Sequence, residues 1–395
     1  MKYASNFKVA LIVVGAIAAI QTALSFSLPL LALEISGKGT GLALIKGAGF
    51  IPNILFAVFI GVINDRMIKA TAFRRYISGL AITVGLLFLA MLSDRVSLLG
   101  LMVFMIVFNG IAYALNNAQM TLIRLSVSKS RLADATALTS TVHSVITTTG
   151  PAVAGFALLQ FGHTGLIGVC LVILAGATIM ARMLHPSEKL PTQQPFWQSM
   201  QEGWQVFTAN RELVMMTVVI VLTNAAEGAF ITALILKMKT VVGLNDFQIG
   251  IVLAAAGFGA VIASRIAAPA RRLLGYRTAF FWPIWILAAL YILMIVTWPF
   301  WVLCLLSFLE GGISLLFAIG VWSYRQESTQ AQHMGRVAGL TGAIFKIGMP
   351  PVIILAGILA DTSNLTSTFI LAAAINVVAA LFLVYVARWG WPLKK

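Results

Sequence analysis

The chain has 395 residues, of which 60% are hydrophobic and 10% are charged, and its mean hydropathy is +0.97. A soluble protein carries about 25% charged residues, so this composition excludes a soluble globular chain and predicts an integral membrane protein. The net charge of +15 is dispersed among loops. It therefore does not form the contiguous basic surface that nucleic-acid binding requires.

The sequence divides into apolar stretches, each near the length of about 20 residues that a membrane-spanning helix needs. The first stretch begins at Val9 and is too long for the apolar core of a signal peptide, which favours a retained helix. We therefore expect an all-α membrane protein with twelve transmembrane helices, at 9–33, 41–63, 76–93, 98–121, 134–159, 164–183, 212–236, 247–267, 278–297, 300–323, 336–359 and 366–388.

The distribution of Lys and Arg predicts the orientation of these helices. If the N-terminus is cytoplasmic, the inner segments hold 21 Lys and Arg residues, and the outer loops hold Lys38, Arg95, Lys237 and Lys239. Cytoplasmic loops of membrane proteins carry an excess of Lys and Arg. Both termini are therefore expected on the cytoplasmic side, which requires an even number of spans.

Residues 61–75 form a short charged cluster between two long apolar runs. Gly61 allows close backbone approach, Asp65 can cap a neighbouring helix N-terminus, and Arg66 and Lys69 supply positive charge at the cytoplasmic surface. We interpret the cluster as a tight turn between the second and third helices. Its place at the membrane edge favours a gate over a substrate contact.

Polar residues inside the predicted helices give a substrate cavity its hydrogen-bonding capacity, and they can equally hold helices together. Lys46 could attract anions, or it could snorkel to the interface. His143 could also relay protons. The candidates for the cavity are Gln21, Lys46, Asn109, Tyr113, Asn116, Asn117, His143 and Asn224.

Residues 184–211 form the longest polar interval and contain three prolines. This interval predicts a cytoplasmic linker between an N-terminal six-helix bundle, residues 1–183, and a C-terminal one, residues 212–395. Within the linker, apolar residues recur at helical spacing from Phe196 onward. An amphipathic helix on the inner membrane face and simple linker packing both fit this pattern.

The two halves resemble parallel repeats. Gly61-x-x-x-Asp65-Arg66 has a counterpart in Ala267-x-x-x-Arg271-Arg272, where the acid is lost. Parallel six-helix halves imply a substrate pathway along their interface and alternating access.

Ionisable residues in membrane helices are rare because each is costly unless it is paired or faces water. Glu227, Glu310 and Lys346 lie near mid-depth in the second half. A glutamate could exchange protons while Lys346 binds an anionic substrate group or pairs with a glutamate. Alternatively, a glutamate and Lys346 could form a fixed ion pair that holds the three helices together.

The chain lacks a phosphate-binding Gly-x-x-x-x-Gly-Lys-Ser/Thr loop and convergent catalytic residues. Cys170 and Cys304 offer neither a disulfide framework nor metal spacing. We therefore expect no enzyme activity, no cofactor and no metal site, with energy supplied by an ion or substrate gradient.

Over its whole length the chain resembles the major facilitator superfamily. The cluster at 61–75 is similar to that family's signature loop, with Gly61, Asp65, Arg66 and Lys69. Gly150, Pro151 and Gly155 resemble its antiporter motif, and residues 335–340 resemble the branch of enterobactin-type siderophore exporters and macrolide efflux proteins. One departure is Ile106, where drug–proton antiporters of the family often carry arginine.

The resemblance implies the major facilitator fold and a monomer in the bacterial inner membrane. It also implies a transporter that exports a small molecule by proton antiport, with a siderophore or related metal-chelating metabolite as cargo. A macrolide or multidrug efflux pump is the alternative.

Overall fold

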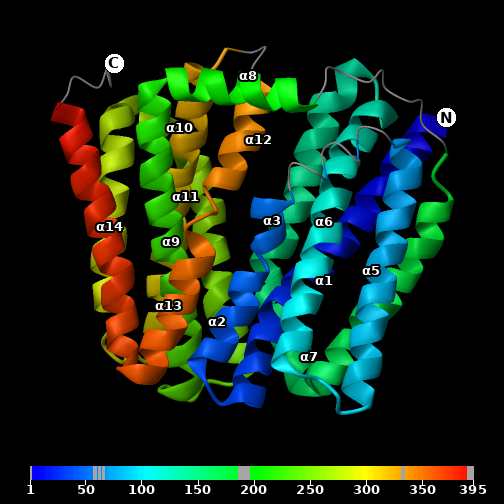
Figure 1. Cartoon of the computed structure of the whole chain (residues 1–395), viewed down its shortest axis with the longest axis horizontal. Helices are drawn as coiled ribbons and strands as arrows, with labels where there is room; N and C mark the ends of the chain where they lie inside the picture. Colours follow the sequence, from blue (N-terminus) through cyan, green and yellow to red (C-terminus); the bar gives the residue numbers. More distant parts are fainter. Residues whose placement is uncertain are drawn as a thin grey trace. The chain divides into compact units, whose positions relative to one another are not determined.

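The computed structural model describes residues 2–56, 60, 64, 67–185, 196–330 and 334–388. Within these ranges the chain is almost entirely α-helical and has no strand (Figure 1). The elements in chain order are α1 (Lys2–Ser36), α2 (Gly39–Ala48), α3 (Ile51–Leu55), α5 (Lys69–Leu92), α6 (Leu98–Ser126), the 3₁₀ turn η1 (Lys129–Arg131), α7 (Leu132–Arg182), α8 (Phe196–Ala209), α9 (Arg211–Thr240), α10 (Asp246–Leu293), α11 (Phe300–Ser328), α12 (Met334–Ile344), α13 (Met349–Thr362) and α14 (Leu365–Arg388).

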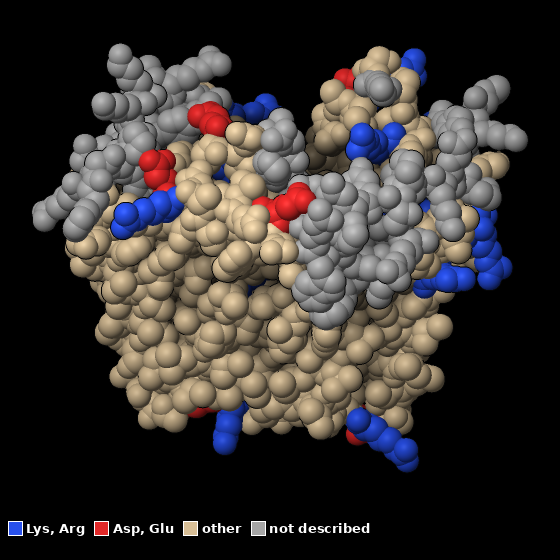
Figure 2. All heavy atoms as spheres, turned by 45° about the horizontal axis from the view of Figure 1, so that its top comes forward, with Lys and Arg blue, Asp and Glu red and all other residues tan. Residues whose placement is uncertain are grey.

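Apolar length explains most of these elements. In the described part of the chain, nine helical segments are long and apolar enough to cross a membrane, and Phe281–Leu293 is a shorter apolar helix. Charged side chains gather toward the helix ends of each bundle, while the flanks between them are uncharged (Figure 2). The predicted fold class, an all-α membrane protein with twelve spans in two six-helix bundles, is confirmed.

Two predicted spans are broken helices. The stretch 41–63 begins as α2, turns at residues 49–50 and resumes as α3, with Pro52 near the start of α3. The stretch 336–359 forms α12 and α13, which are separated by turns at residues 345–348 just before Pro350 and Pro351. Proline lacks a backbone N–H and cannot complete the hydrogen-bond ladder, which explains both interruptions.

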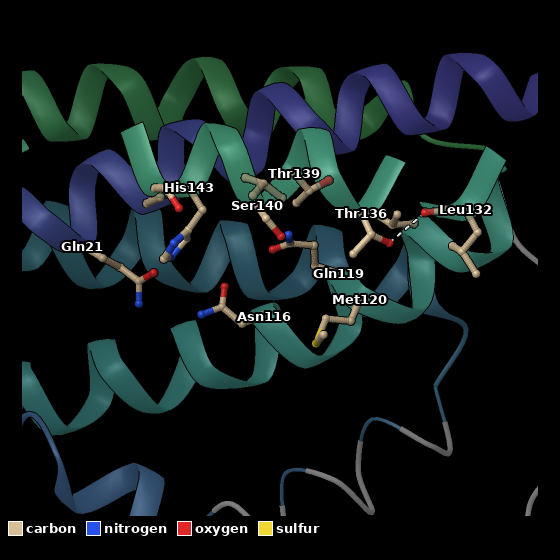
Figure 3. Close-up of a pocket in the computed structure, with 13 residues that line it drawn as sticks. Gln21, Asn116, Gln119, Met120, Leu132, Thr136, Thr139, Ser140 and His143 are labelled. Atoms are coloured by element: carbon tan, nitrogen blue, oxygen red, sulfur yellow. Dashed lines mark hydrogen bonds between the residues drawn. The ribbon is translucent and has the colours of Figure 1, made fainter. Parts of the chain in front are cut away.

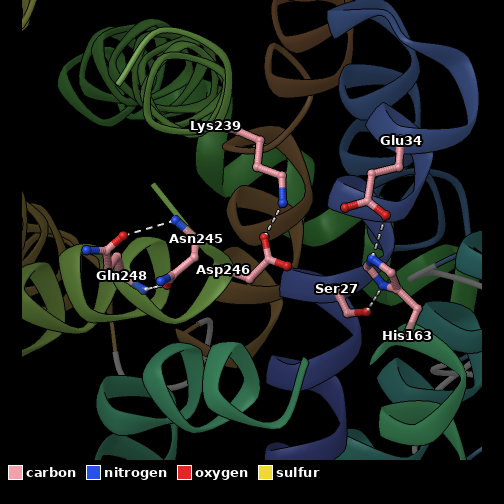
Figure 4. Close-up of polar contacts among 7 residues, drawn as sticks. All are labelled: Ser27, Glu34, His163, Lys239, Asn245, Asp246 and Gln248. Atoms are coloured by element: carbon pink, nitrogen blue, oxygen red, sulfur yellow. Dashed lines mark hydrogen bonds and ion pairs between the residues drawn. The ribbon is translucent and has the colours of Figure 1, made fainter. Parts of the chain in front are cut away.

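The predicted fifth and sixth spans lie together in α7, and Gly162 separates them. Its φ of 65° and ψ of −178° are not helical, and glycine adopts this conformation without steric cost. His163 follows directly. Its ring contacts the Ser27 hydroxyl at 2.8 Å and the Glu34 carboxylate at 3.2 Å, which fastens this turn to α1 (Figure 4).

The sequence predicts a loop between the eighth and ninth spans, and this prediction is wrong. The backbone continues as helix through residues 268–280 within α10. Alanine, leucine and arginine, which are strong helix formers, are frequent in this stretch and favour continuation. At the start of α10, Asn245 and Gln248 form a reciprocal capping box with distances of 2.9 and 3.0 Å (Figure 4).

The chain forms two compact units whose limits differ from the predicted domains. Unit 1 contains residues 1–37 and 48–193, and unit 2 contains residues 38–47 and 194–395. The N-terminal bundle predicted at 1–183 is therefore not continuous, because α2 packs with the C-terminal helices.

Part of the predicted linker is helical, from Phe196 to Ala209. The described residues include α8, whereas 186–195 lie outside them. Phe207 of α8 is buried against Leu213 of α9 and Val337 of α12, while Trp204 is exposed. Helix α8 thus packs onto unit 2 along one face.

Helix α2 docks on α13 inside unit 2. The Asp361 carboxylate accepts hydrogen bonds from the backbone N–H groups of Gly39 and Thr40, at 2.6 and 2.8 Å, and from the Thr40 hydroxyl at 2.5 Å. Further along, a Cβ on Gly357 would lie 2.5 Å from the Ala43 Cβ, so glycine is needed for this close approach. A carboxylate cap and small contact residues together fix α2 in place.

We predict that Asp361→Ala loosens α2. The substitution removes the acceptor for two orphan N–H groups at a helix start, a loss of about 1–2 kcal/mol in the free energy of unfolding. Equilibrium unfolding in mixed detergent micelles measures it. Thr362→Val is the control, since Thr362 bonds to Ile358 of its own helix. Equal stability of the two variants would contradict the capping role.

Candidate functional site

Unit 1 contains a polar pocket between α1, α6 and α7. Its volume is about 520 Å³, and Gln21, Asn116 and His143 point into it from the three helices (Figure 3). The remaining lining residues are Val14, Ala18, Gln119, Met120, Ile123, Leu132, Thr136, Thr139, Ser140 and Ser144. Among the described residues that line it there is no Lys, Arg, Asp or Glu and no Phe, Tyr or Trp.

The polar groups of this pocket remain available for a ligand. In the described chain, Gln21, Asn116, Gln119 and His143 make no side-chain hydrogen bonds. Three of these four residues were predicted from the sequence, and Gln119 was missed. A sequence signal also exists on α7, because Thr136, Ser140 and His143 recur at the spacing of one helix face.

The other uncharged candidates of the first half do not line the pocket. The Asn109 amide donates to the Met105 carbonyl and the Asn117 amide to the Tyr113 carbonyl, both at 2.9 Å and four residues back along α6. Tyr113 itself also lies outside the lining. A polar residue can thus be satisfied by its own helix, which sequence alone does not reveal.

Three of the four predicted gate residues, Gly61, Asp65 and Arg66, lie outside the described residues. Lys69 is described and buried at the start of α5, where its ammonium donates to the Asn64 carbonyl. The Asn64 amide in turn donates to the Ala114 carbonyl of α6 at 2.9 Å. These contacts tie the end of the cluster to unit 1.

The antiporter-like motif lies at a close helix contact. A Cβ on Gly150 would lie 2.6 Å from a methyl carbon of Thr22, so this glycine brings α7 against α1. Pro151 lies inside α7, and Gly155 is buried one turn further. The motif therefore acts at least in packing.

Unit 2 brings together ionisable side chains from several helices, of which Glu310 and Tyr291 are buried and Lys46 and Glu227 are partly buried. Glu227 of α9 interacts electrostatically with Lys46 of α2 and with Glu310 of α11. The hydroxyl of Tyr291, from α10, interacts with the Glu310 carboxyl. Asn376 of α14 also interacts with that hydroxyl. Five helices thus contribute to one polar cluster, which we call the carboxylate cluster.

The structure changes the predicted partner of the glutamates. Lys346 lies in the turn between α12 and α13, and no described carboxylate pairs with it. Lys46 takes the place that we expected for Lys346, which corrects its interpretation as an interfacial cation. The reason is the docking of α2 in unit 2, which sequence reasoning placed in the N-terminal bundle.

Asn224 has a structural role. Its amide donates to the Phe345 carbonyl at 2.9 Å, across 121 residues of sequence. The break before α13 frees carbonyls from the helix ladder, and Asn224 satisfies one of them. This side chain is therefore not free to contact a substrate.

Two residues of the carboxylate cluster, Tyr291 and Asn376, were missed in the sequence. Asn376 is an isolated polar residue in the apolar stretch 366–388, and such residues mark functional or packing sites in membranes. Tyr291 gave no signal because an aromatic residue is ordinary in an apolar helix. Its ring stacks on Phe230 with centroids 4.1 Å apart.

Helix α11 is held close to α10 beside Glu310. A Cβ on Gly311 would overlap the backbone carbonyl of Ala256, so the two backbones touch at this level. Glycine permits such contact between membrane helices. The position of Glu310 is consequently fixed by backbone packing and not by a flexible loop.

Ser27, His163 and Glu34 contain the residue types of a nucleophilic triad, but Ser27 is completely buried and cannot meet a substrate. In the part of the chain that the structure describes, no group of three His, Cys, Asp or Glu residues could hold a metal ion.

The fold and the two polar sites define a polytopic membrane transporter. The family model described as Major Facilitator Superfamily matches residues 10–226, which is more than half of the chain. The chain therefore belongs to the Major Facilitator Superfamily. No curated protein matches it in sequence.

Solved transporter structures share the fold. A bacterial homologue of the human lysosomal transporter Spinster aligns with a TM-score of 0.76 at 13% identity, over 98% of this chain and 97% of its own. The nucleoside transporter NupG gives 0.75 at 14%, over 98% and 99%. A bacterial homologue of the iron transporter ferroportin gives 0.76 at 14%, over 96% and 98%. At these identities the likeness concerns the fold alone.

We predict that Lys46 and Glu227 are energetically coupled. Lys46→Met should lower stability, and Glu227→Gln should restore part of the loss, because an unpaired buried charge is removed. The expected coupling lies within roughly 0.5–3 kcal/mol, as for interacting residues. Equilibrium unfolding of the two single variants and the double variant measures it.

A parallel cycle with Lys346→Met and Glu227→Gln is the control. We expect additivity within about 0.5 kcal/mol, because the structure gives these side chains no contact. Coupling in the Lys346 cycle and additivity in the Lys46 cycle would reverse our assignment.

Proposed function

We propose that this protein exports a small molecule in exchange for protons. The observation that carries the proposal is the carboxylate cluster, in which Glu227 and Glu310 lie within electrostatic range of each other in the membrane interior. Two nearby carboxylates repel strongly where the dielectric constant is low. Taking up one proton relieves this repulsion, so the pair can bind a proton and release it when its surroundings change.

Lys46 stabilises the state of the carboxylate cluster in which Glu227 carries a negative charge. When Glu227 is ionised, Lys46 compensates it, and Glu310 is then the carboxyl that gains or loses the proton. In this proposal, Lys46, Glu227 and Glu310 together perform the proton coupling. The family's drug–proton antiporters often carry an arginine for this task at the position of Ile106. The proposed division of roles also concentrates proton coupling in unit 2.

The pocket of unit 1 supports binding of a hydrophilic cargo. Its amides, hydroxyls and imidazole can donate to and accept from carbonyl and hydroxyl groups, and its apolar residues can contact a carbon skeleton. We propose a siderophore or related metal-chelating metabolite, on the basis of the motif at 335–340. A macrolide or multidrug cargo is the alternative, and the absence of aromatic residues from the described lining speaks against it.

The same proposal includes the setting of the protein. The excess of cations in the predicted inner segments supports a bacterial inner membrane location with both termini in the cytoplasm. A monomer suffices, since the proposed proton site and the cargo pocket both lie in one chain.

Proton coupling is tested in everted membrane vesicles. With an acidic lumen, uptake of a triscatecholate siderophore should be stimulated in the parent protein. Glu310→Gln should abolish this stimulation while leaving exchange of labelled for unlabelled siderophore, because the carboxyl that carries the proton is removed.

Asp246→Asn is the matched control, since its carboxylate contacts Lys239 at 2.5 Å at a helix end, away from the carboxylate cluster (Figure 4). Unchanged stimulation by the acidic lumen in both Glu310→Gln and Glu227→Gln would reject the proton role. Uptake of a macrolide and not of the siderophore would select the alternative cargo.

We predict that Gln119→Leu weakens cargo binding. Loss of one hydrogen bond, worth ~1 kcal/mol, should raise KM about fivefold with little change in maximal rate. Asn117→Leu on the same helix is the control, because its amide faces the Tyr113 carbonyl and not the pocket. Equal KM values for the two variants would exclude Gln119 as a contact.

A further inference from the structure

Several buried polar atoms of unit 2 lack a hydrogen-bond partner among the described residues, and three of them belong to Asn376 and Glu310. Asn376 is 1% exposed, and neither its Oδ1 nor its Nδ2 meets a partner in the described chain. Glu310 is 5% exposed, and its Oε1 is equally unpartnered. Each unsatisfied buried group costs about 1–3 kcal/mol, so a ligand that satisfied these atoms would be strongly favoured.

The unpartnered atoms belong to one neighbourhood. The Tyr291 hydroxyl interacts with both the Glu310 carboxyl and the Asn376 amide, so the two groups lie in one neighbourhood. Ser307 lies one turn before Glu310 on α11, is fully buried, and has an unpartnered hydroxyl. Residues three apart share a helix face, so Ser307 extends the same polar surface.

The chemistry of these atoms selects the ligand. Asn376 offers two N–H donors and a carbonyl acceptor. A metal cation would satisfy the oxygen and leave the Nδ2 donors unpaired, and an apolar molecule would satisfy neither. A water molecule can accept from Nδ2 and donate to Oε1 of Glu310 at the same time, as buried waters usually do.

We propose that Asn376 is a positioning residue that holds a buried water against Glu310, and that this water delivers the proton to the carboxylate. The inference rests on the proposed proton antiport and names its last step. A hydronium ion formed at the water passes one proton to Oε1, which yields a neutral carboxyl and a neutral water. Release is the reverse, with the proton returning to the water and the carboxylate reforming.

The surrounding groups keep this geometry rigid. Tyr291 is stacked on Phe230, and α11 touches α10 at Gly311, so neither side of the site can shift freely. The titratable groups that face Glu310 are Tyr291 from α10 and Glu227 from α9, with Lys46 of α2 acting through Glu227. Asn376, which comes from α14, carries no charge. It therefore acts on Glu310 through the water that it holds.

Infrared difference spectroscopy of the purified full-length protein tests the proposal. A pH-dependent carboxylic C=O band that disappears in Glu310→Gln reports the proton on Glu310. Asn376→Leu should move this band to higher wavenumber and remove a water O–H band that shifts in ¹⁸O-labelled water. Asn376→Ala removes the same amide with a smaller side chain and should have the same effect on both bands, which provides a second variant if Asn376→Leu fails to fold.

Thr232→Val is the control, because Thr232 is buried in α9 and bonds to Gly228 of its own helix. It should leave both bands unchanged. If Glu310→Gln removes the carboxyl band and no Asn376 variant that folds moves it, the water inference is wrong while proton coupling stands. Loss of the water band on adding sodium chloride at constant pH would show that a cation occupies the site and would overturn the inference. If no pH-dependent band belongs to Glu310, the proposed coupling fails together with the inference.

Discussion

The interaction between Lys46 and Glu227 is the constraint on which unit 2 depends. Neither charge is tolerable alone in the hydrocarbon interior, so each side chain requires the other to lie nearby. Lys46 comes from α2, and its position next to α9 requires residues 38–47 to leave the first bundle. Docking on α13 and capping by Asp361 also hold α2 in the position that brings Lys46 next to Glu227. Electrostatics and close packing thus act on the same ten residues.

A second constraint is the satisfaction of backbone groups where helices are interrupted. Asn224 accommodates a carbonyl freed by the break before α13, and Asp361 accepts the N–H groups at the start of α2. At the end of α10, the Lys237 ammonium donates to three successive carbonyls, those of Met294, Ile295 and Val296, at 2.7–2.8 Å. In a medium without water these groups must find partners in the protein. Several polar residues that look functional in the sequence have this task.

These two constraints, charge pairing and the satisfaction of backbone groups, explain which features could be predicted from the sequence. The apolar stretches fix the helices because length and hydropathy act locally, and they place Glu227 and Glu310 inside helices. The partner of Glu227 depends on which bundle α2 joins, which is a long-range packing outcome that no local pattern reports. Asn117 and Asn116 are adjacent and chemically identical, yet one bonds to its own helix and the other lines the pocket. Helix rotation decides between them, and it follows from the packing of α1, α6 and α7.

The packing of residues 38–47 with the C-terminal helices also has a consequence for how the protein is made. Helix α2 is synthesised early, but its partners Glu227 and Asp361 follow roughly 180 and 320 residues later in the chain. The charge of Lys46 therefore lacks its partner Glu227 until most of the chain has been inserted. A C-terminal half produced alone would lack α2, leave Glu227 without its cation and expose the surface of α13 at Gly357. We therefore expect that the gene cannot be divided at the linker into two self-sufficient halves, because unit 2 includes residues 38–47 from the first part of the chain.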